Sequence, residues 1–292
     1  MGTGEHLRGE IIAAVLDRAS RNGGFVTRDE LTSMPLATGS QRVIDRTRGI
    51  WNPREMDATL SVLSSPDGPY ADREVAGGLF RYAYQDGSIN GVNAKLRRAH
   101  ELQKPIILLR KVRNGIFVPI APVYVVEDLV EKREFLLALD ESVRFLAEER
   151  SPLERRYVEQ LVKRRLHQAE FRGRVIAAYS TRCAICRLRH GELLDAAHII
   201  ADRDEDGLPD VSNGLSLCKI HHAAFDGYLI GISPDCQVRV DRQLLEEIDG
   251  PMLQYGLQGM HGVRLTLPEQ RRDRPDADRL EQRYAEFLRR AS

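Results

Sequence analysis

Two short cysteine motifs in the second half of the chain limit its fold more than any other feature. The first is CAIC, with Cys183 and Cys186, and the second is CKIH, which begins at Cys218 and ends at His221. Together they offer four soft ligands, the set that tetrahedral Zn²⁺ needs in a closed structural site. Buried free thiols are the alternative, but a second knuckle at this range is uncommon by chance. We therefore predict a zinc-braced fold here, with Cys236 as a lone core residue.

A second histidine stands directly beside the fourth of these ligands, in the stretch LCKIHHAAFD. Neighbouring side chains on a helix point about 100° apart, so His221 and His222 are not expected to serve one site. His222 and Asp226 are four residues apart, so they share a helix face and can hold a hard divalent cation together. The pattern predicts two metal sites that meet back to back.

Polar residues of the neighbouring segments complete this pattern. The expected strand LLDAAHII carries Asp195 and His198, and the loop SNGLSLC carries Asn213. A lone histidine in such a place is most often a satisfied polar core residue, and the joint order of these residues is what speaks against that. The arrangement CAIC…LLDAAHII…SNGLSLCKIHHAAFD resembles the HNH endonuclease family, in the subgroup whose ββα-metal fold is braced by zinc. The resemblance covers about residues 170–232.

The resemblance implies three catalytic roles. His198 would be the general base, Asn213 would fix the loop that orients this base, and His222 would be a ligand of the catalytic metal. Many family members carry Asp or His immediately before the base, whereas this chain has Ala197. Asp195 and Asp226 are the candidate substitutes as ligands of the catalytic cation. That cation, Mg²⁺ or Mn²⁺, is expected at the scissile phosphate, while zinc is expected to be purely structural.

The rest of the chain divides into segments of different texture. Residues 1–40 are expected to form a helical appendage, in which Thr27 and Glu30 make a capping box. Residues 41–145 are rich in β-branched and aromatic runs such as PIILLR and PVYVVED, with one helix near 91–102, which predicts a β-barrel with helices. Residues 151–250 would be the nuclease domain with a basic linker helix, and residues 251–292 a helical tail. The fold class is α+β.

The net charge is zero, but the charges are unevenly distributed. Between residues 154 and 190 there are ten Arg and Lys against three acids, and between residues 92 and 114 there are seven against one. Two basic segments in a neutral protein are compatible with phosphate contacts, and solvated helix faces explain them equally well.

The expected β-barrel domain, residues 41–145, resembles a second known family. The order YQDGSINGVNAKLRRAHELQKPIILLRKVRNGIFVPIAPVYVVED resembles the SRA domain, a PUA-like crescent-shaped β-barrel that reads modified cytosine by flipping it out. The resemblance implies a base pocket, for which Tyr70 and Tyr82 are the candidate stacking rings and Asp72 the candidate acceptor. Barrel core is the alternative for both rings. The candidate phosphate contacts are Lys95, Arg97, Arg98, Arg110, Lys111 and Arg113.

A modified-base reader fused to an HNH nuclease would be a modification-dependent restriction endonuclease. Its expected partner is double-stranded DNA carrying 5-methylcytosine or 5-hydroxymethylcytosine, with a homodimer as one route to double-strand cleavage. An HNH nuclease that reads unmodified sequence or another modification stays open, as does a catalytically silent zinc-containing DNA-binding protein. No apolar run is long enough to span a membrane and no signal pattern begins the chain, so a cytoplasmic location is expected.

Overall fold

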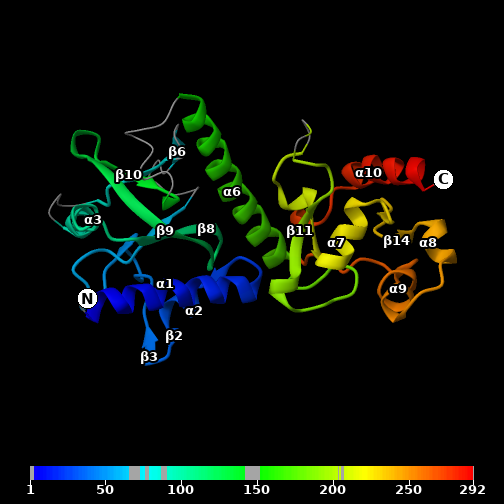
Figure 1. The fold of residues 1–292 in the computed structure, drawn as a ribbon, viewed down its shortest axis with the longest axis horizontal. Coiled ribbons are helices and arrows are strands. Elements are labelled where there is room, and N and C mark those ends of the chain that lie inside the picture. Colours follow the sequence, from blue (N-terminus) through cyan, green and yellow to red (C-terminus); the bar gives the residue numbers. More distant parts are fainter. Residues whose placement is uncertain are drawn as a thin grey trace. The chain divides into compact units, whose positions relative to one another are not determined.

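The computed structural model describes residues 3–65, 73–75, 79–86, 91–141, 152–202, 204 and 207–291. The chain divides into two compact units (Figure 1). Unit 1 comprises residues 1–19 and 25–170, and unit 2 comprises residues 20–24 and 171–292. Within the described ranges, no helix combines the length and apolarity that a membrane crossing requires.

A curled sheet forms the centre of unit 1. Its strands follow the order β4-β5-β8-β9-β10-β7-β6, and β1 pairs with β9. The pair β5 and β8 is parallel, and the other neighbours are antiparallel. The bounds are β1 (Val26–Thr27), β4 (Ile50–Trp51), β5 (Ser61–Ser64), β6 (Arg73–Val75), β7 (Leu79–Ala83), β8 (Ile106–Arg113), β9 (Ile116–Leu129) and β10 (Glu134–Ala138).

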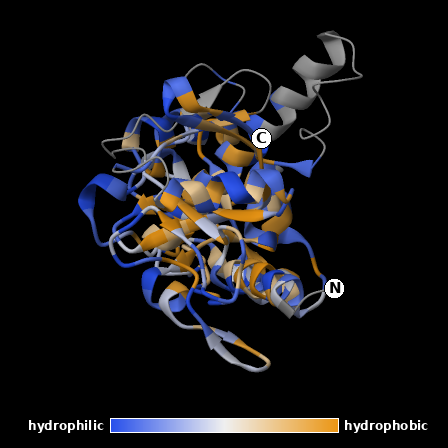
Figure 2. Ribbon diagram, turned by 90° about the vertical axis from the view of Figure 1, so that its left-hand side faces the viewer, coloured by the Kyte–Doolittle hydropathy of each residue, from blue (hydrophilic) through white to orange (hydrophobic). Residues whose placement is uncertain are grey.

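Strand β8 shows why the sheet is covered on both faces. Its side chains alternate between two apolar clusters, as successive residues of a strand must. Ile106 and Leu108 pack in one cluster with the helix α3 (Val92–Glu101), and Ile107 and Leu109 pack in the other with the helix α1 (Thr3–Asn22). Figure 2 shows the apolar residues gathered inside and the polar residues outside.

Residues 20–24 of the expected N-terminal appendage belong to unit 2, and its other described residues belong to unit 1. Ile11 and Val15 of α1 are fully buried in its core, and β1 extends its sheet. The capping box is present: the Thr27 hydroxyl accepts from the Glu30 amide, and the Thr27 amide donates to the Glu30 carboxylate. The remaining elements of unit 1 are α2 (Arg28–Thr32), β2 (Met34–Leu36), β3 (Gly39–Gln41) and the 3₁₀ helix η1 (Val130–Lys132).

Unit 2 is built on a ββα arrangement. Strands β11 (Leu194–His198) and β12 (Gly214–Cys218) form an antiparallel hairpin, and helix α7 (Lys219–Asp226) follows directly and packs on both. The basic helix α6 (Pro152–Ala178) begins in unit 1 and continues into unit 2 from Phe171 onward. The other elements are η2 (Gly191–Leu193), η3 (Val211–Asn213), β13 (Ile230–Ile232), β14 (Val238–Val240), α8 (Arg242–Glu246), α9 (Pro251–Gly256), η4 (Gln258–Met260), η5 (Arg271–Asp273) and α10 (Ala277–Arg290).

Candidate active site and metal centre

The four predicted zinc ligands converge. One ligand atom from each of Cys183, Cys186, Cys218 and His221 lies within 4.8 Å of all the others. The Nδ1 atom of His221 is 3.5 Å from the Cys183 Sγ and 3.2 Å from the Cys218 Sγ, and the Sγ atoms of Cys186 and Cys218 are 4.0 Å apart. Zinc bonded to sulfur at about 2.3 Å and to nitrogen at about 2.05 Å in a tetrahedron would place these atoms about 3.6–3.8 Å apart. The donor set therefore fits zinc in both chemistry and spacing.

The ring of His221 is oriented from its other side. Its Nε2 lies 2.8 Å from the carbonyl oxygen of Gly256, the last residue of α9. Donation from Nε2–H to this carbonyl leaves Nδ1 free as the ligand atom. A backbone carbonyl is a usual hydrogen-bond partner for the second ring nitrogen of a metal-bound histidine. The segment after α8, which sequence reasoning assigned to a tail, thus supports the metal centre.

The candidate base, His198, is positioned by the hairpin and by α6. His198 is the last residue of β11 and pairs in register with Gly214, the first residue of β12. A Cβ atom at Gly214 would come within 2.4 Å of the Val175 side chain and 3.0 Å of the Phe171 ring, so only glycine lets α6 approach this closely. The Phe171 ring stacks on the His198 imidazole, with centroids 3.9 Å apart and planes inclined by 14°.

This packing also sets the electrostatics of His198. Burial lowers the pKa of the imidazole, and the nearby Asp202 carboxylate opposes that shift. Its Nε2 is buried and has no hydrogen-bond partner in the part of the chain that the structure describes. A lowered pKa favours the neutral imidazole, which is the state that a general base requires.

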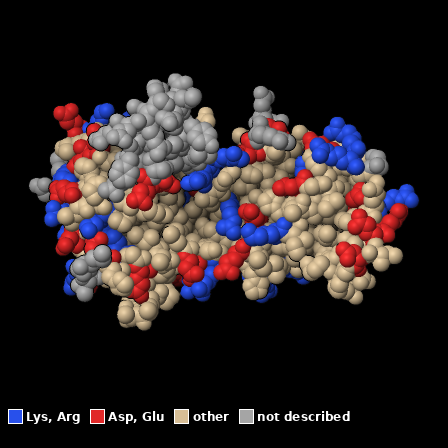
Figure 3. Space-filling model, viewed as in Figure 1, with Lys and Arg blue, Asp and Glu red and all other residues tan. Residues whose placement is uncertain are grey.

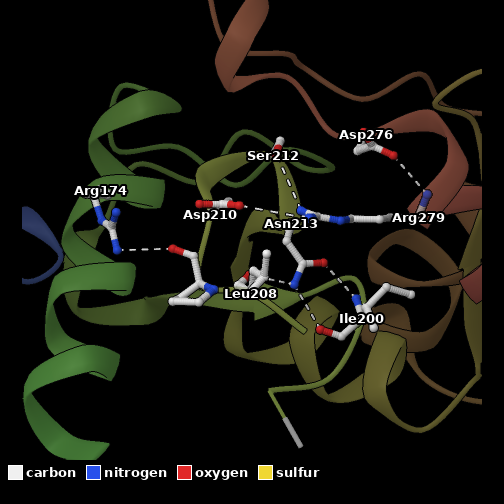
Figure 4. Close-up of polar contacts among 9 residues, drawn as sticks. Arg174, Ile200, Leu208, Asp210, Ser212, Asn213, Asp276 and Arg279 are labelled. Carbon is white, nitrogen blue, oxygen red and sulfur yellow. Dashed lines mark hydrogen bonds and ion pairs between the residues drawn. The ribbon is translucent and has the colours of Figure 1, made fainter. Parts of the chain in front are cut away.

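Asn213 is fully buried and holds the loop that follows His198 (Figure 4). Its side-chain oxygen accepts from the Ile200 amide at 2.9 Å, and its side-chain nitrogen donates to the carbonyls of Ile200 and Leu208, both at 3.0 Å. The Ile199 amide also donates to the Asn213 backbone carbonyl at 2.9 Å. One side chain therefore holds the backbone on the carboxyl side of His198.

The candidate ligands of the catalytic cation meet around His222. Its Nδ1 is 3.7 Å from the Asp195 carboxylate, and its Nε2 is 3.3 Å from the Asp226 carboxylate. The hydrogen bonds to Asp195 and Asp226 raise the pKa of His222 to about 9. The two carboxylates face opposite ring nitrogens, so a cation on either nitrogen has one carboxylate beside it while the other orients the ring. These nitrogen and oxygen donors suit Mg²⁺ or Mn²⁺.

Arg172 of α6 steadies one of these carboxylates. Its Nε lies 3.3 Å from the Asp195 Oδ1, and its guanidinium also donates to the Leu194 carbonyl at 2.8 Å. Burial works against ionisation of Asp195, yet the hydrogen bond from His222 and the charge of Arg172 lower its pKa. The carboxylate is therefore kept ionised and oriented, as a metal ligand must be.

A comparison with protein families matches residues 183–233 to the model of the HNH endonucleases. Residues 183–233 form an HNH endonuclease domain. The matched segment contains both cysteine knuckles and the three candidate catalytic residues, His198, Asn213 and His222. No curated protein matches this chain.

Several solved structures resemble the chain weakly. A "Modification dependent TagI restriction endonuclease" is 16% identical over 83% of this chain and 86% of that one, with a TM-score of 0.32. The SUVH5 SRA domain in complex with hemimethylated CG DNA is 18% identical over 39% of this chain and 82% of that one, with a TM-score of 0.28. The "Type IV phosphorothioation-dependent restriction endonuclease ScoMcrA" is 17% identical over 62% and 51%, with a TM-score of 0.22.

The residues predicted for a base pocket in unit 1 do not come together as a described site. Tyr70 and Asp72 lie outside the described residues. Tyr82 is fully buried in the sheet core, and its hydroxyl donates to the Gly49 carbonyl at 3.1 Å. Its ring therefore serves as barrel core, the alternative reading, and presents no open face for stacking on a base.

The candidate phosphate contacts of unit 1 divide into bound and exposed groups. The prediction of Arg110 as a phosphate contact is wrong, because this residue is buried. Its guanidinium bonds the Glu170 carboxylate at 2.6 Å and the Ser64 hydroxyl at 2.7 Å. Arg97 pairs with Asp128 at 2.5 Å, and Arg98 pairs with a neighbouring acid, Glu101, at 2.7 Å. Lys95 is exposed, and Lys111 and Arg113 are half-buried.

Sequence reasoning missed two functional neighbours of the HNH domain, Phe171 and Arg172. Both lie on the basic helix α6 and contact residues more than 20 positions away in the chain. The one available signal was that α6 carries an aromatic residue and an arginine side by side among surface-type residues. That pattern alone does not identify their partners.

Proposed function

We propose that this protein is a modification-dependent DNA endonuclease that reads 5-methylcytosine or 5-hydroxymethylcytosine with unit 1 and hydrolyses phosphodiester bonds with its HNH domain. The observation that carries the nuclease half is the arrangement on one ββα unit of a half-buried His198 with a lowered pKa, an Asn213 clamp and His222 between two carboxylates. The reader half is supported by the SRA-like order of the sequence and by the curled sheet of unit 1.

The chain's own residues divide the chemistry among them. His198 takes a proton from the attacking water, and Phe171 and Asn213 hold it in place through the ring stack and the loop. His222, with Asp226 or Asp195, would hold one divalent cation, which supplies charge neutralisation at the scissile phosphate and the leaving 3′ oxygen. Zinc at the cysteine site takes no part in the reaction and stabilises the HNH domain instead.

The decisive experiment offers the protein matched duplexes with cytosine, 5-methylcytosine or 5-hydroxymethylcytosine, in Mg²⁺ or Mn²⁺. We expect cleavage of one or both modified duplexes, and no cleavage by the His198→Ala variant. Equal cleavage of modified and unmodified DNA would refute the reader half alone. Absence of cleavage of every duplex, with intact DNA binding, would refute the nuclease half and favour a silent DNA-binding protein.

The candidate pocket residues are tested in a His198→Ala background by competition binding. Stacking on a flipped base is worth about 1–3 kcal/mol, so Tyr70→Ala and Asp72→Ala should weaken the preference for modified DNA about 10-fold. Tyr82→Phe is the matched control, because it keeps the buried ring and removes the hydroxyl, which bonds the Gly49 carbonyl and the Gln85 side chain. If all variants discriminate as well as the parent, Tyr70 and Asp72 are not the pocket.

A further inference from the structure

The C-terminal helix α10 is firmly attached to the HNH domain, although it lies outside the matched segment. Phe287 is buried, and a Cβ at Gly231 would come within 2.4 Å of its ring, so α10 packs directly on β13. At its other end, the Asp276 amide donates to the Ser212 carbonyl, and Ser212 directly precedes Asn213. Helix α10 is therefore a fixed wall of unit 2.

A cavity of about 450 Å³ lies between α10 and the loop that leaves the active-site strand. One wall consists of residues 199–201, which follow His198 directly and are held by Asn213. Three residues span at most about 11 Å, so this wall is close to the proposed base. The opposite wall is the C-terminal half of α10, which contributes Arg283, Arg289 and Arg290.

Cationic groups dominate the described lining of this cavity. Three arginines face two acids, Asp204 and Glu286. Figure 3 shows Lys and Arg side chains gathered over α10. The guanidinium of Arg283 is occupied, because it lies 3.5 Å from the Glu286 carboxylate and donates to the Phe225 carbonyl at 3.0 Å. It belongs to the scaffold of the cavity.

Arg290 has a different environment. Its guanidinium carbon lies 4.0 Å from the centre of the Tyr228 ring, and that of Arg283 lies 3.9 Å from the same centre. Tyr228 is held in turn by its hydroxyl bond to Glu286 at 2.7 Å. Within the described ranges, Arg290 pairs with no carboxylate. Two guanidinium groups thus lie against one ring, and among the described residues the carboxylate of Glu286 pairs with that of Arg283 alone, so an added anion would stabilise the arrangement.

We propose that this cavity binds a backbone phosphate of the DNA strand that the HNH domain cleaves. The bound phosphate lies on the side of the scissile bond that is nearer to residues 199–201. Arg290 and Arg289 are the contacting groups, and Tyr228 with Arg283 holds Arg290 in position. A phosphate here would fix the DNA strand relative to His198, because residues 199–201, which Asn213 holds, line the cavity and directly follow His198. The inference rests on the proposed nuclease function and adds a binding site outside the matched segment.

The test measures binding of an unmodified and a modified duplex across salt concentration, with the full chain carrying His198→Ala. Each phosphate contact contributes about 0.9 to the slope of log affinity against log salt. Arg290→Gln should make the slope shallower by about 0.9 and raise Kd about 3- to 10-fold on both duplexes, and Arg290→Lys should recover most of the slope. Arg289→Gln should act in the same direction.

The matched control is Arg242→Gln on α8, which removes the same charge from an exposed arginine of unit 2 outside the cavity. It should leave the slope unchanged, and the melting temperatures of all variants should agree. If Arg290→Gln and Arg242→Gln shift binding equally, the effect is net charge and the cavity is not a phosphate site, while the proposed function stands. If the parent protein neither binds nor cuts DNA, the proposed function itself fails.

Discussion

Replacing Asn213 by alanine tests how far the loop after His198 depends on one side chain. The substitution removes three buried hydrogen bonds, to the Ile200 amide, the Ile200 carbonyl and the Leu208 carbonyl. Each bond contributes about 0.5–1.5 kcal/mol, and each buried backbone group left without a partner costs about 1–3 kcal/mol. A water that entered the polar gap would offset part of these costs, so we expect unit 2 to lose about 3–5 kcal/mol of unfolding free energy.

The catalytic consequence is separate from the loss of stability. The Asn213 side chain bonds backbone groups of Ile200 and Leu208, so it acts on His198 through the loop as a positioning residue, and its loss should lower kcat with little change in KM. We expect kcat to fall about 100-fold for Asn213→Ala at a temperature where the variant is folded. Asn213→Asp is the sharper variant, because it keeps the acceptor for the Ile200 amide and places a carboxylate oxygen against two carbonyls.

Hydrogen exchange distinguishes the clamp from a general effect on folding. The Ile200 amide should lose protection in Asn213→Ala and keep part of it in Asn213→Asp, whereas amides of β13 should change only by the global destabilisation. Zinc content should stay at one per chain in both variants. Wild-type kcat together with an unprotected Ile200 amide would refute the idea that this loop positions the base.

Three further predictions concern the neighbouring groups. His221→Ala should release zinc and unfold unit 2, whereas His222→Ala should retain zinc and abolish cleavage; metal analysis and melting curves check this, and zinc retention by His221→Ala would contradict it. Burial lowers the pKa of His198 below its usual value of about 6.5, so the acid limb of log kcat against pH should be centred below pH 6.5. By linkage, the unfolded chain binds this proton more readily than the folded chain, so the free energy of unfolding falls as pH drops below about 6.5, and it falls less in His198→Ala. An acid limb of kcat centred above pH 6.5 would contradict the assignment of His198 as the base. Phe171→Leu should keep the core apolar but remove the ring stack on His198, lowering kcat about 10-fold with unchanged DNA affinity, and an unchanged single-turnover rate would show that the stack has no positioning role.

Local spacing determined much of this protein from the sequence alone. The two cysteine knuckles, the separation of His221 from His222, and the shared face of His222 and Asp226 all follow from helix and turn geometry within a few residues. The capping box at Thr27 is of the same kind. Such features were predictable because the backbone period fixes which neighbours share a face.

Tertiary packing decided the features that depend on distant partners. Arg110 lies in a basic run, yet it is buried against Glu170, which is 60 residues away. Tyr82 has the spacing of a pocket ring, but the sheet turns it into the core. The stack of Phe171 on His198 and the α10 cavity likewise require contacts that no local pattern encodes. An alternating or charged sequence pattern indicates which side chains can be buried. Only the tertiary fold determines which residues pack against them.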